Sequence, residues 1–327
     1  MKTQMYPLLF DPVYKSYLWG GGRIATLFDR APQQARIAES WEIADRPEGM
    51  SVVRNGPLAG SSLHDQVTGL KAQLLGSATS AAVFPLLVKI IDAQQRLSLQ
   101  VHPDDRAAEK HGGQAKTEMW YVLHADPGAG VFVGTVSGVD AKAFQQALKE
   151  KRSEAVLRRI PVQAGEAIYV PGGCVHAIDQ GCVLLEVQQN SNTTYRVDDW
   201  GRVDQDGQPR ALHVAEALRV MRWPATPEEP KVAARPLPGR GPNSRWEILK
   251  CPYFVMTRMT LREREQVTNS GRSFHALFVA AGSVRVEGGG AGASLGRGTS
   301  CLLPAGLEQY SLTPEDGEAA VLRISLP

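Results

Sequence analysis

Residues 162–178 read VQAGEAIYVPGGCVHAI, and residues 294–312 read SLGRGTSCLLPAGLEQYSL. Both stretches contain a glycine, four further residues, a Val or Leu, and then a Pro-Gly-Gly or Pro-Ala-Gly turn that leads into another strand. An alternating apolar stretch precedes each copy, EMWYVL at 118–123 and HALFVAAGSV at 275–284. An internal repeat of this kind indicates two related antiparallel β-barrels.

The remaining periodicity agrees with a strand-rich chain that contains a few helices. Apolar runs and strict alternation predict strands at 84–101, 117–134, 166–170 and 182–188, and again from Trp246 onward. Apolar residues at helical spacing predict helices at 62–80, 139–160 and 212–221. We therefore expect a mainly β fold of two cupin-like (jelly-roll) modules with inserted α-helices.

A proline-rich stretch indicates where the two modules meet. Six prolines lie between residues 223 and 243, a composition typical of a linker. We expect a metal-binding catalytic domain with helical insertions at 1–225, a linker at 226–243 and a second cupin-like domain at 244–327. The repeat places Gln309 where the first copy has His176, so we expect no metal in the second domain.

Composition excludes several classes of protein. The 327 residues include 36 Lys+Arg and 34 Asp+Glu, so no broad basic field is available for nucleic acid or an anionic membrane. The best apolar run, residues 81–91, is interrupted by Pro85 and Lys89 and is too short to span a bilayer. Four cysteines without a CxxC pair indicate reduced thiols and a cytoplasmic protein.

Four residues of the first module form a candidate metal site. Gln100 and His102 project from the same face of a predicted strand, Glu118 opens the next strand, and His176 follows the Pro-Gly-Gly turn. One carboxylate, two imidazoles and an amide oxygen suit a divalent transition metal, of which zinc fits best, and no cysteine closes the set. Each histidine alone has a simpler interpretation as a packed or surface side chain, and His124 ranks second as a ligand.

These residues lie in blocks that resemble the type I mannose-6-phosphate isomerases, in particular their short bacterial branch within the cupin superfamily. The blocks are FPLLVKI (84–90), LSLQVHPDD (97–105), KTEMWY (116–121), YVPGGCVHA (169–177) and QQNSNTTYRV (188–197). A further stretch, AESWE at 38–42, also fits that branch, and the blocks are collinear over residues 10–200.

The resemblance implies an enzyme with one zinc ion per chain that interconverts mannose 6-phosphate and fructose 6-phosphate. It implies that the metal ligands are Gln100, His102, Glu118 and His176. It also implies that Arg196, Lys116 and Glu186 lie at the active site, and that Lys89 and Ser98 help to hold the phosphate.

The residue types agree with that chemistry but leave the proton-transfer group open. Glu186 could act as the base, and Lys116 could do so only if its environment lowered its pKa. Arg196 is always protonated, so it suits charge stabilisation. Lys89, within an apolar strand, needs an anion, a protein partner or a path to solvent. Asn192 stands where many relatives carry Asp, and because an amide is no base we expect it only to form hydrogen bonds.

Two alternative functions remain open at this point. The same scaffold could serve a non-catalytic regulator that binds a sugar phosphate, or a metal oxygenase, although an iron oxygenase favours more histidine ligands than this set offers. We expect a small sugar phosphate as the partner, no nucleic acid or membrane, and either a monomer or a homodimer.

Overall fold

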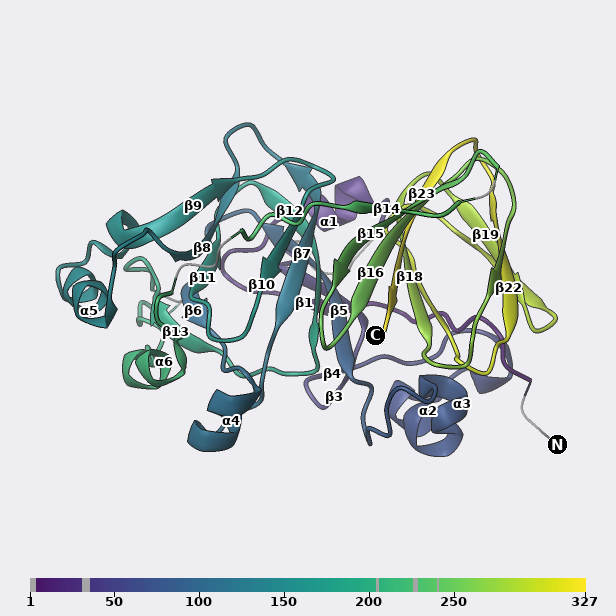
Figure 1. Cartoon of the computed structure of the whole chain (residues 1–327), viewed down its shortest axis with the longest axis horizontal. Helices are drawn as coiled ribbons and strands as arrows, with labels where there is room; N and C mark the ends of the chain where they lie inside the picture. The colour runs from purple at the N-terminus through teal and green to yellow at the C-terminus, as the bar shows by residue number, and fades with distance from the viewer. Residues whose placement is uncertain (1–3, 31–35, 204–205, 226–228, 240) are drawn as a thin grey trace.

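Two antiparallel barrels make up most of the chain. The computed structural model describes residues 4–30, 36–203, 206–225, 229–239 and 241–327. The first barrel, in blue and teal, and the second, in green and yellow, lie side by side (Figure 1). The predicted mainly β architecture with two cupin-like modules is therefore confirmed.

The first barrel is formed by two facing sheets. The six-stranded sheet has the order β1-β2-β5-β12-β7-β10, with bounds Val13–Lys15, Glu39–Ile43, Leu86–Ala93, Cys182–Gln189, Glu118–Ala125 and Ala167–Val170. The five-stranded sheet has the order β13-β6-β11-β8-β9, with bounds Tyr195–Asp198, Leu99–Val101, His176–Ile178, Gly130–Thr135 and Leu157–Pro161. A short hairpin, β3 (Asp45–Arg46) with β4 (Gly49–Met50), lies outside both sheets.

The second barrel repeats this plan. Its six-stranded sheet has the order β14-β15-β16-β23-β18-β21, with bounds Arg235–Leu237, Ser244–Lys250, Val255–Leu261, Ala319–Ser325, His275–Ala281 and Ser300–Leu303. The facing sheet has the order β17-β22-β19-β20, with bounds Glu265–Thr268, Gln309–Pro314, Val284–Gly288 and Ala291–Leu295.

The helices are shorter than the periodicity predicts. They are α1 to α6, with bounds Arg23–Leu27, Leu63–Leu70, Ala72–Leu75, Asp105–His111, Ala141–Lys149 and Val214–Val220. The predicted helix at 62–80 is two helices because Lys71 has a left-handed φ of 48°. The predicted helix at 139–160 ends at Lys149, since Lys151 also has a positive φ and β9 follows. Within the described residues, no helix is long and apolar enough to cross a membrane.

The N-terminal segment packs on the second barrel before the chain enters the first. Leu8 and Leu302 exchange two backbone hydrogen bonds of 2.9 Å, and one apolar cluster contains residues of both barrels. Further along, the Arg30 guanidinium donates to both Glu42 oxygens, at 2.8 and 3.0 Å, and to the carbonyl of Gly298. The two barrels are therefore joined by a shared core and by the hydrogen bond from Arg30, itself paired with Glu42, to Gly298 of the second barrel.

The proposed linker is in part extended along the barrels. Its residues 226–228 and 240 lie outside the described residues. In the described part, the amide of Tyr169 donates to the carbonyl of Pro230 at 2.8 Å, and β14 is hydrogen-bonded to β15 of the second barrel. The division into domains at 1–225 and 244–327 stays a prediction.

We predict that Leu302→Ala destabilises the chain by about 2–5 kcal/mol, the usual cost of a cavity at a fully buried leucine. Leu302 is 0% exposed. Leu212→Ala is the control, because this side chain is 51% exposed and its truncation costs at most about 0.5 kcal/mol. Chemical denaturation of both variants measures the difference, and equal midpoints would show that Leu302 does not contribute to the shared core.

Candidate active site

Strand register brings the predicted site residues together from distant parts of the sequence. In the five-stranded sheet, Arg196 of β13 lies opposite Gln100 of β6, and Gln100 lies opposite His176 of β11. In the facing sheet, Lys89 of β5 lies opposite Glu186 of β12. These residues of the two sheets face each other across the interior of the first barrel.

The centre of the site is a cluster of three buried side chains. One ligand atom each from His102, Glu118 and His176 lies within 4.8 Å of the others. His102 Nδ1 is 2.8 Å from the carbonyl oxygen of Thr193, and His176 Nδ1 is 2.9 Å from that of Cys174. A carbonyl can only accept, so each Nδ1 carries the proton and each Nε2 keeps its lone pair. These Nε2 atoms are 3.6 and 3.3 Å from the Glu118 oxygens.

Both imidazoles are held neutral, as a metal ligand requires. Burial lowers the pKa of His176 to about 4, and burial, with help from the Lys116 charge, lowers the pKa of His102 well below its usual value. A neutral imidazole whose Nδ1–H is fixed by a carbonyl is the form in which histidine binds metals.

The unsatisfied atoms of this cluster fit a cation. Both Glu118 oxygens are buried, and Oε1 has no hydrogen-bond partner among the described residues, while burial together with the Glu186 charge raises the pKa of Glu118 to about 7. The amide of Gln100 reaches within 3.3 Å of His176 Nε2, and rotation of that amide by 180° presents its oxygen instead of its nitrogen. The atoms that face the centre of the cluster are thus nitrogen and oxygen atoms that can accept but not donate hydrogen bonds. Such a set of atoms could hold a divalent metal ion.

A lysine–carboxylate network adjoins the cluster. The Lys116 ammonium is 2.5 Å from Glu118 Oε2, 3.0 Å from His102 Nε2 and 3.6 Å from Glu186 Oε1. Lys89 is 3.0 Å from the same Glu186 oxygen. Burial disfavours the charge of Glu186, but the two lysines outweigh it and lower its pKa to about 2, so that this carboxylate is ionised at neutral pH.

Lys89 already has protein partners for its charge. Besides Glu186, its ammonium is 3.3 Å from Glu39 Oε1. From the sequence, Lys89 needs an anion, a protein partner or a path to solvent, and the structure provides two carboxylates as protein partners. Its assignment to the phosphate stays a prediction.

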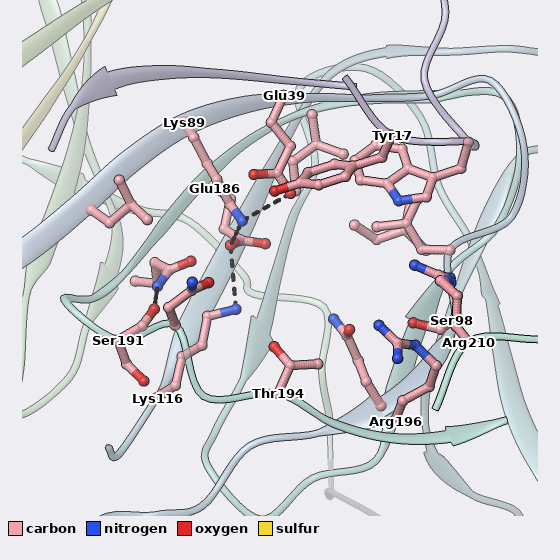
Figure 2. A pocket seen from close by; sticks show the side chains of 18 residues that line it. Tyr17, Glu39, Lys89, Ser98, Lys116, Glu186, Ser191, Thr194, Arg196 and Arg210 are labelled. Carbon is pink, nitrogen blue, oxygen red and sulfur yellow. Dashed lines mark hydrogen bonds and ion pairs between the residues drawn. The ribbon is translucent and has the colours of Figure 1, made fainter. Parts of the chain in front are cut away.

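A cavity of about 280 Å³ opens between the two sheets of the first barrel. Six predicted residues line it: Lys89, Ser98, Gln100, Lys116, Glu186 and Arg196. Figure 2 shows Lys89, Glu39, Glu186 and Lys116 on one side, and Ser98, Arg196 and Arg210 on the other. The three buried side chains of the cluster adjoin the cavity through Lys116, which contacts His102 and Glu118, and through Gln100, which contacts His176.

Arg210 is a cavity residue that the sequence interpretation missed. Arg210 and Arg202 share one carboxylate, Asp199, at 2.5 and 2.6 Å. Arg196 donates to the carbonyl of Ala211 at 2.8 Å, and burial followed by the charge of Arg210 lowers its pKa. No periodicity marks Arg210, which the path of the loop after β13 brings to the cavity.

Two secondary expectations can be compared with the structure. The amide of Asn192 donates to Glu48 Oε1 at 3.0 Å, in agreement with the expected hydrogen-bonding role. His124, ranked second as a ligand, instead lies 3.1 Å from Asp126 Oδ1, is partly exposed, and is outside the buried cluster. All four cysteines are free and buried, as expected.

Comparison with known proteins identifies relatives along nearly the whole chain. Two family models match: phosphomannose isomerase type I, catalytic domain, over residues 8–127, and mannose-6-phosphate isomerase, cupin domain, over residues 246–324. The probable mannose-6-phosphate isomerase GmuF of Bacillus subtilis is 34% identical over 314 residues, which cover 94% of this chain and 96% of the relative. The mannose-6-phosphate isomerase ManA of the same organism is 34% identical over 311 residues, which cover 94% of this chain and 95% of the relative.

Solved structures agree with these relatives. The crystal structure of the mannose 6-phosphate isomerase from Bacillus subtilis has a TM-score of 0.88 at 27% identity, covering 98% of this chain and 99% of that one. Fold and site thus define a two-barrel cupin protein with a buried histidine–glutamate cluster beside a polar cavity. The chain belongs to the type I mannose-6-phosphate isomerase family and is an isomerase of that family, which confirms the resemblance.

We predict that His176→Ala removes most bound metal, because it deletes one of two neutral imidazole ligands. His124→Ala, at the partly exposed histidine outside the cluster, should keep the metal content of the parent chain. Elemental analysis after dialysis measures metal per chain in both variants. Full metal occupancy in His176→Ala would overturn the ligand assignment.

Proposed function

We propose that this chain interconverts mannose 6-phosphate and fructose 6-phosphate with one zinc ion held by Gln100, His102, Glu118 and His176. The observation that carries the proposal is the acceptor-only cluster next to a polar cavity of about 280 Å³. The names of the relatives support the substrate. A mixed N/O set without cysteine supports zinc in a site that keeps a position open for substrate.

The reaction moves a proton between C1 and C2 of the open-chain sugar, and negative charge develops on the carbonyl oxygen. When bound, the metal supplies Lewis-acid stabilisation of that charge. Arg196 also stabilises the negative charge on the carbonyl oxygen, because β13 places it opposite Gln100 at the edge of the ligand set. Its guanidinium stays protonated throughout, so it contributes charge rather than proton transfer.

Glu186 and Lys116 carry the proton transfer in this proposal. Glu186 lines the cavity and is ionised, so it can accept a proton from one carbon and return it to the neighbouring carbon. Lys116 is 3.6 Å from Glu186 Oε1 and can donate a proton to the developing oxygen anion, then recover one from the neighbouring hydroxyl as the new carbonyl forms. Trp120 Nε1 donates to the other Glu186 oxygen at 2.8 Å, which orients the carboxylate.

Charge balance favours the arginine side of the cavity for the substrate phosphate. Arg196, Arg202 and Arg210 face one carboxylate, Asp199, which leaves a formal charge of +2 on these four side chains. On the other side, every lysine contact is with a carboxylate or a histidine. A phosphate ester carries nearly two negative charges, so we assign it to Arg210 with Ser98. This proposal replaces the assignment of the phosphate to Lys89 that the resemblance implies, and Lys89 then serves to position Glu186.

A coupled assay with mannose 6-phosphate tests the function. We expect turnover in the metal-loaded chain, loss of turnover after chelation, and recovery when zinc is restored. The control is the chelated chain incubated with Mg²⁺, an ion that prefers oxygen ligands and should not restore activity. Binding of the sugar phosphate without turnover would instead support the alternative, a non-catalytic regulator.

We predict different kinetic effects for the two cavity arginines. Arg196→Ala should lower kcat by about 10²–10³-fold, the usual loss for one donor to a developing oxyanion, and lysine there should rescue only part of it. Arg210→Ala should chiefly raise KM for mannose 6-phosphate, by about 10–100-fold, since a charged hydrogen bond contributes about 1.5–3 kcal/mol. Arg262→Ala, a surface arginine paired with Glu318, is the control.

Steady-state kinetics of the three variants separate the roles. An Arg196→Ala enzyme with normal kcat and a raised KM would make Arg196 a phosphate anchor. An Arg210→Ala enzyme with normal KM would contradict this assignment and would place the phosphate-binding site on the lysine side of the cavity.

A further inference from the structure

The second barrel repeats the strand register of the active site with different side chains. In the first barrel, Glu186 of β12 lies opposite Lys89 of β5. In the second barrel, Arg323 of β23 lies opposite Thr257 of β16. Since β23 and β16 hold the same places in their sheet as β12 and β5, Arg323 occupies the position that Glu186 has in the first barrel.

The polar side chains of this region face the interior of the second barrel. His275 is two residues before Leu277 in β18, and Arg323 is two residues after Val321 in β23. Leu277 and Val321 belong to the apolar cluster that fills the barrel, so His275 and Arg323 share that inward face. We call Arg245, His275, Tyr310 and Arg323 the arginine cluster.

A hydrogen-bonded chain sets the tautomer of His275. Arg323 donates to the hydroxyl of Tyr310, and that hydroxyl lies 2.9 Å from His275 Nδ1. Tyr310 is 1% exposed, so its own proton needs an acceptor, and no other acceptor for it is found among the described residues. Nδ1 of His275 is therefore the acceptor, and Nε2 carries the ring proton.

The ring and the phenol are both neutral. Burial, followed by the Arg323 charge, lowers the pKa of His275 to about 3. Burial raises the pKa of Tyr310 to about 12. The cluster thus offers N–H donors from His275 and from both guanidinium groups.

The positive charge of the cluster is only partly compensated. Arg245 is ion-paired with Glu265, which also accepts from Asn243 at 2.7 Å. Within the described parts of the chain, no carboxylate is ion-paired with Arg323, whose charge lowers the pKa of Arg245 after burial does. Two arginines against one carboxylate leave a formal charge of +1. His275 and Arg323 are each half-buried, so neither side chain is fully enclosed by the barrel.

We propose that the arginine cluster binds a small oxyanion of the phosphate class, either inorganic phosphate or the phosphate group of a sugar phosphate. A half-buried guanidinium without a carboxylate gains most from an anion that accepts several hydrogen bonds. The site is separate from the active-site cavity, because none of its residues lines that cavity.

Isothermal titration of inorganic phosphate into the metal-loaded full chain tests the proposal. The Arg210→Ala background weakens phosphate binding at the active site, so that the remaining binding reports on the second barrel. We expect Arg323→Gln in this background to weaken that binding by about 10–100-fold, since a charged hydrogen bond contributes about 1.5–3 kcal/mol. Arg262→Gln, an exposed arginine of the same barrel paired with Glu318, should leave binding unchanged.

A second variant and a second readout keep the result decisive. Tyr310→Phe removes the hydroxyl that sets the His275 tautomer, so it should also weaken phosphate binding while keeping the apolar ring. With the native Arg210 restored, Arg323→Gln and Tyr310→Phe should keep the kcat of the parent chain, which separates this site from the proposed isomerase activity.

The choice of ligand identifies the source of the phosphate group. Arg323-dependent binding of mannose 6-phosphate but not of free mannose would assign the site to a sugar phosphate. Binding of inorganic phosphate alone would assign it to the free ion. Equal phosphate affinity in the parent, Arg323→Gln and Tyr310→Phe chains, or no phosphate binding outside the active site, would overturn the proposal.

Discussion

His102 and His176 each donate their Nδ1 proton to a backbone carbonyl, that of Thr193 and that of Cys174. Because the proton is held there, both Nε2 lone pairs are available next to the Glu118 carboxylate. A reversal of either hydrogen bond would place a donor in the cluster and exclude a cation. The acceptor character of the whole centre therefore depends on two main-chain oxygens, which no side-chain substitution at those positions removes.

The same site buries negatively charged carboxylates, and two lysines compensate their charge. Glu118 and Glu186 are nearly fully buried, and an unpaired carboxylate there would be strongly destabilising. Lys116 contacts both carboxylates, and Lys89 links Glu186 to Glu39 on the neighbouring strand. Charge compensation thus extends across β2, β5, β12 and β7, so the sheet supports the site electrostatically as well as sterically.

Sequence reasoning succeeded where local rules decide the structure. The two-residue spacing of Gln100 and His102, the repeated turn motif and the alternating strands predicted the two barrels and the proximity of His102, Glu118 and His176, whose role as metal ligands stays a prediction. It failed where distant backbone paths decide. Arg210 and Glu39 reach the cavity through a loop and a neighbouring strand that no periodicity marks. The positive φ angles of Lys71 and Lys151, which interrupt the predicted helices, are equally invisible, because lysine has no preference for that conformation.

The two barrels show how one scaffold can carry a site for a cation and a site for an anion. Their strand registers agree, so position alone does not distinguish Glu186 from Arg323. The side chains differ, since Gln309 stands where the first barrel has His176, and the hydrogen-bond partner of the histidine in each barrel differs as well. A carbonyl oxygen takes a proton from the rings of the first barrel and leaves a lone pair, whereas the hydroxyl of Tyr310 gives a proton to His275 and leaves an N–H. The arginine next to that N–H then completes a donor set, and the change of sign requires no change of fold.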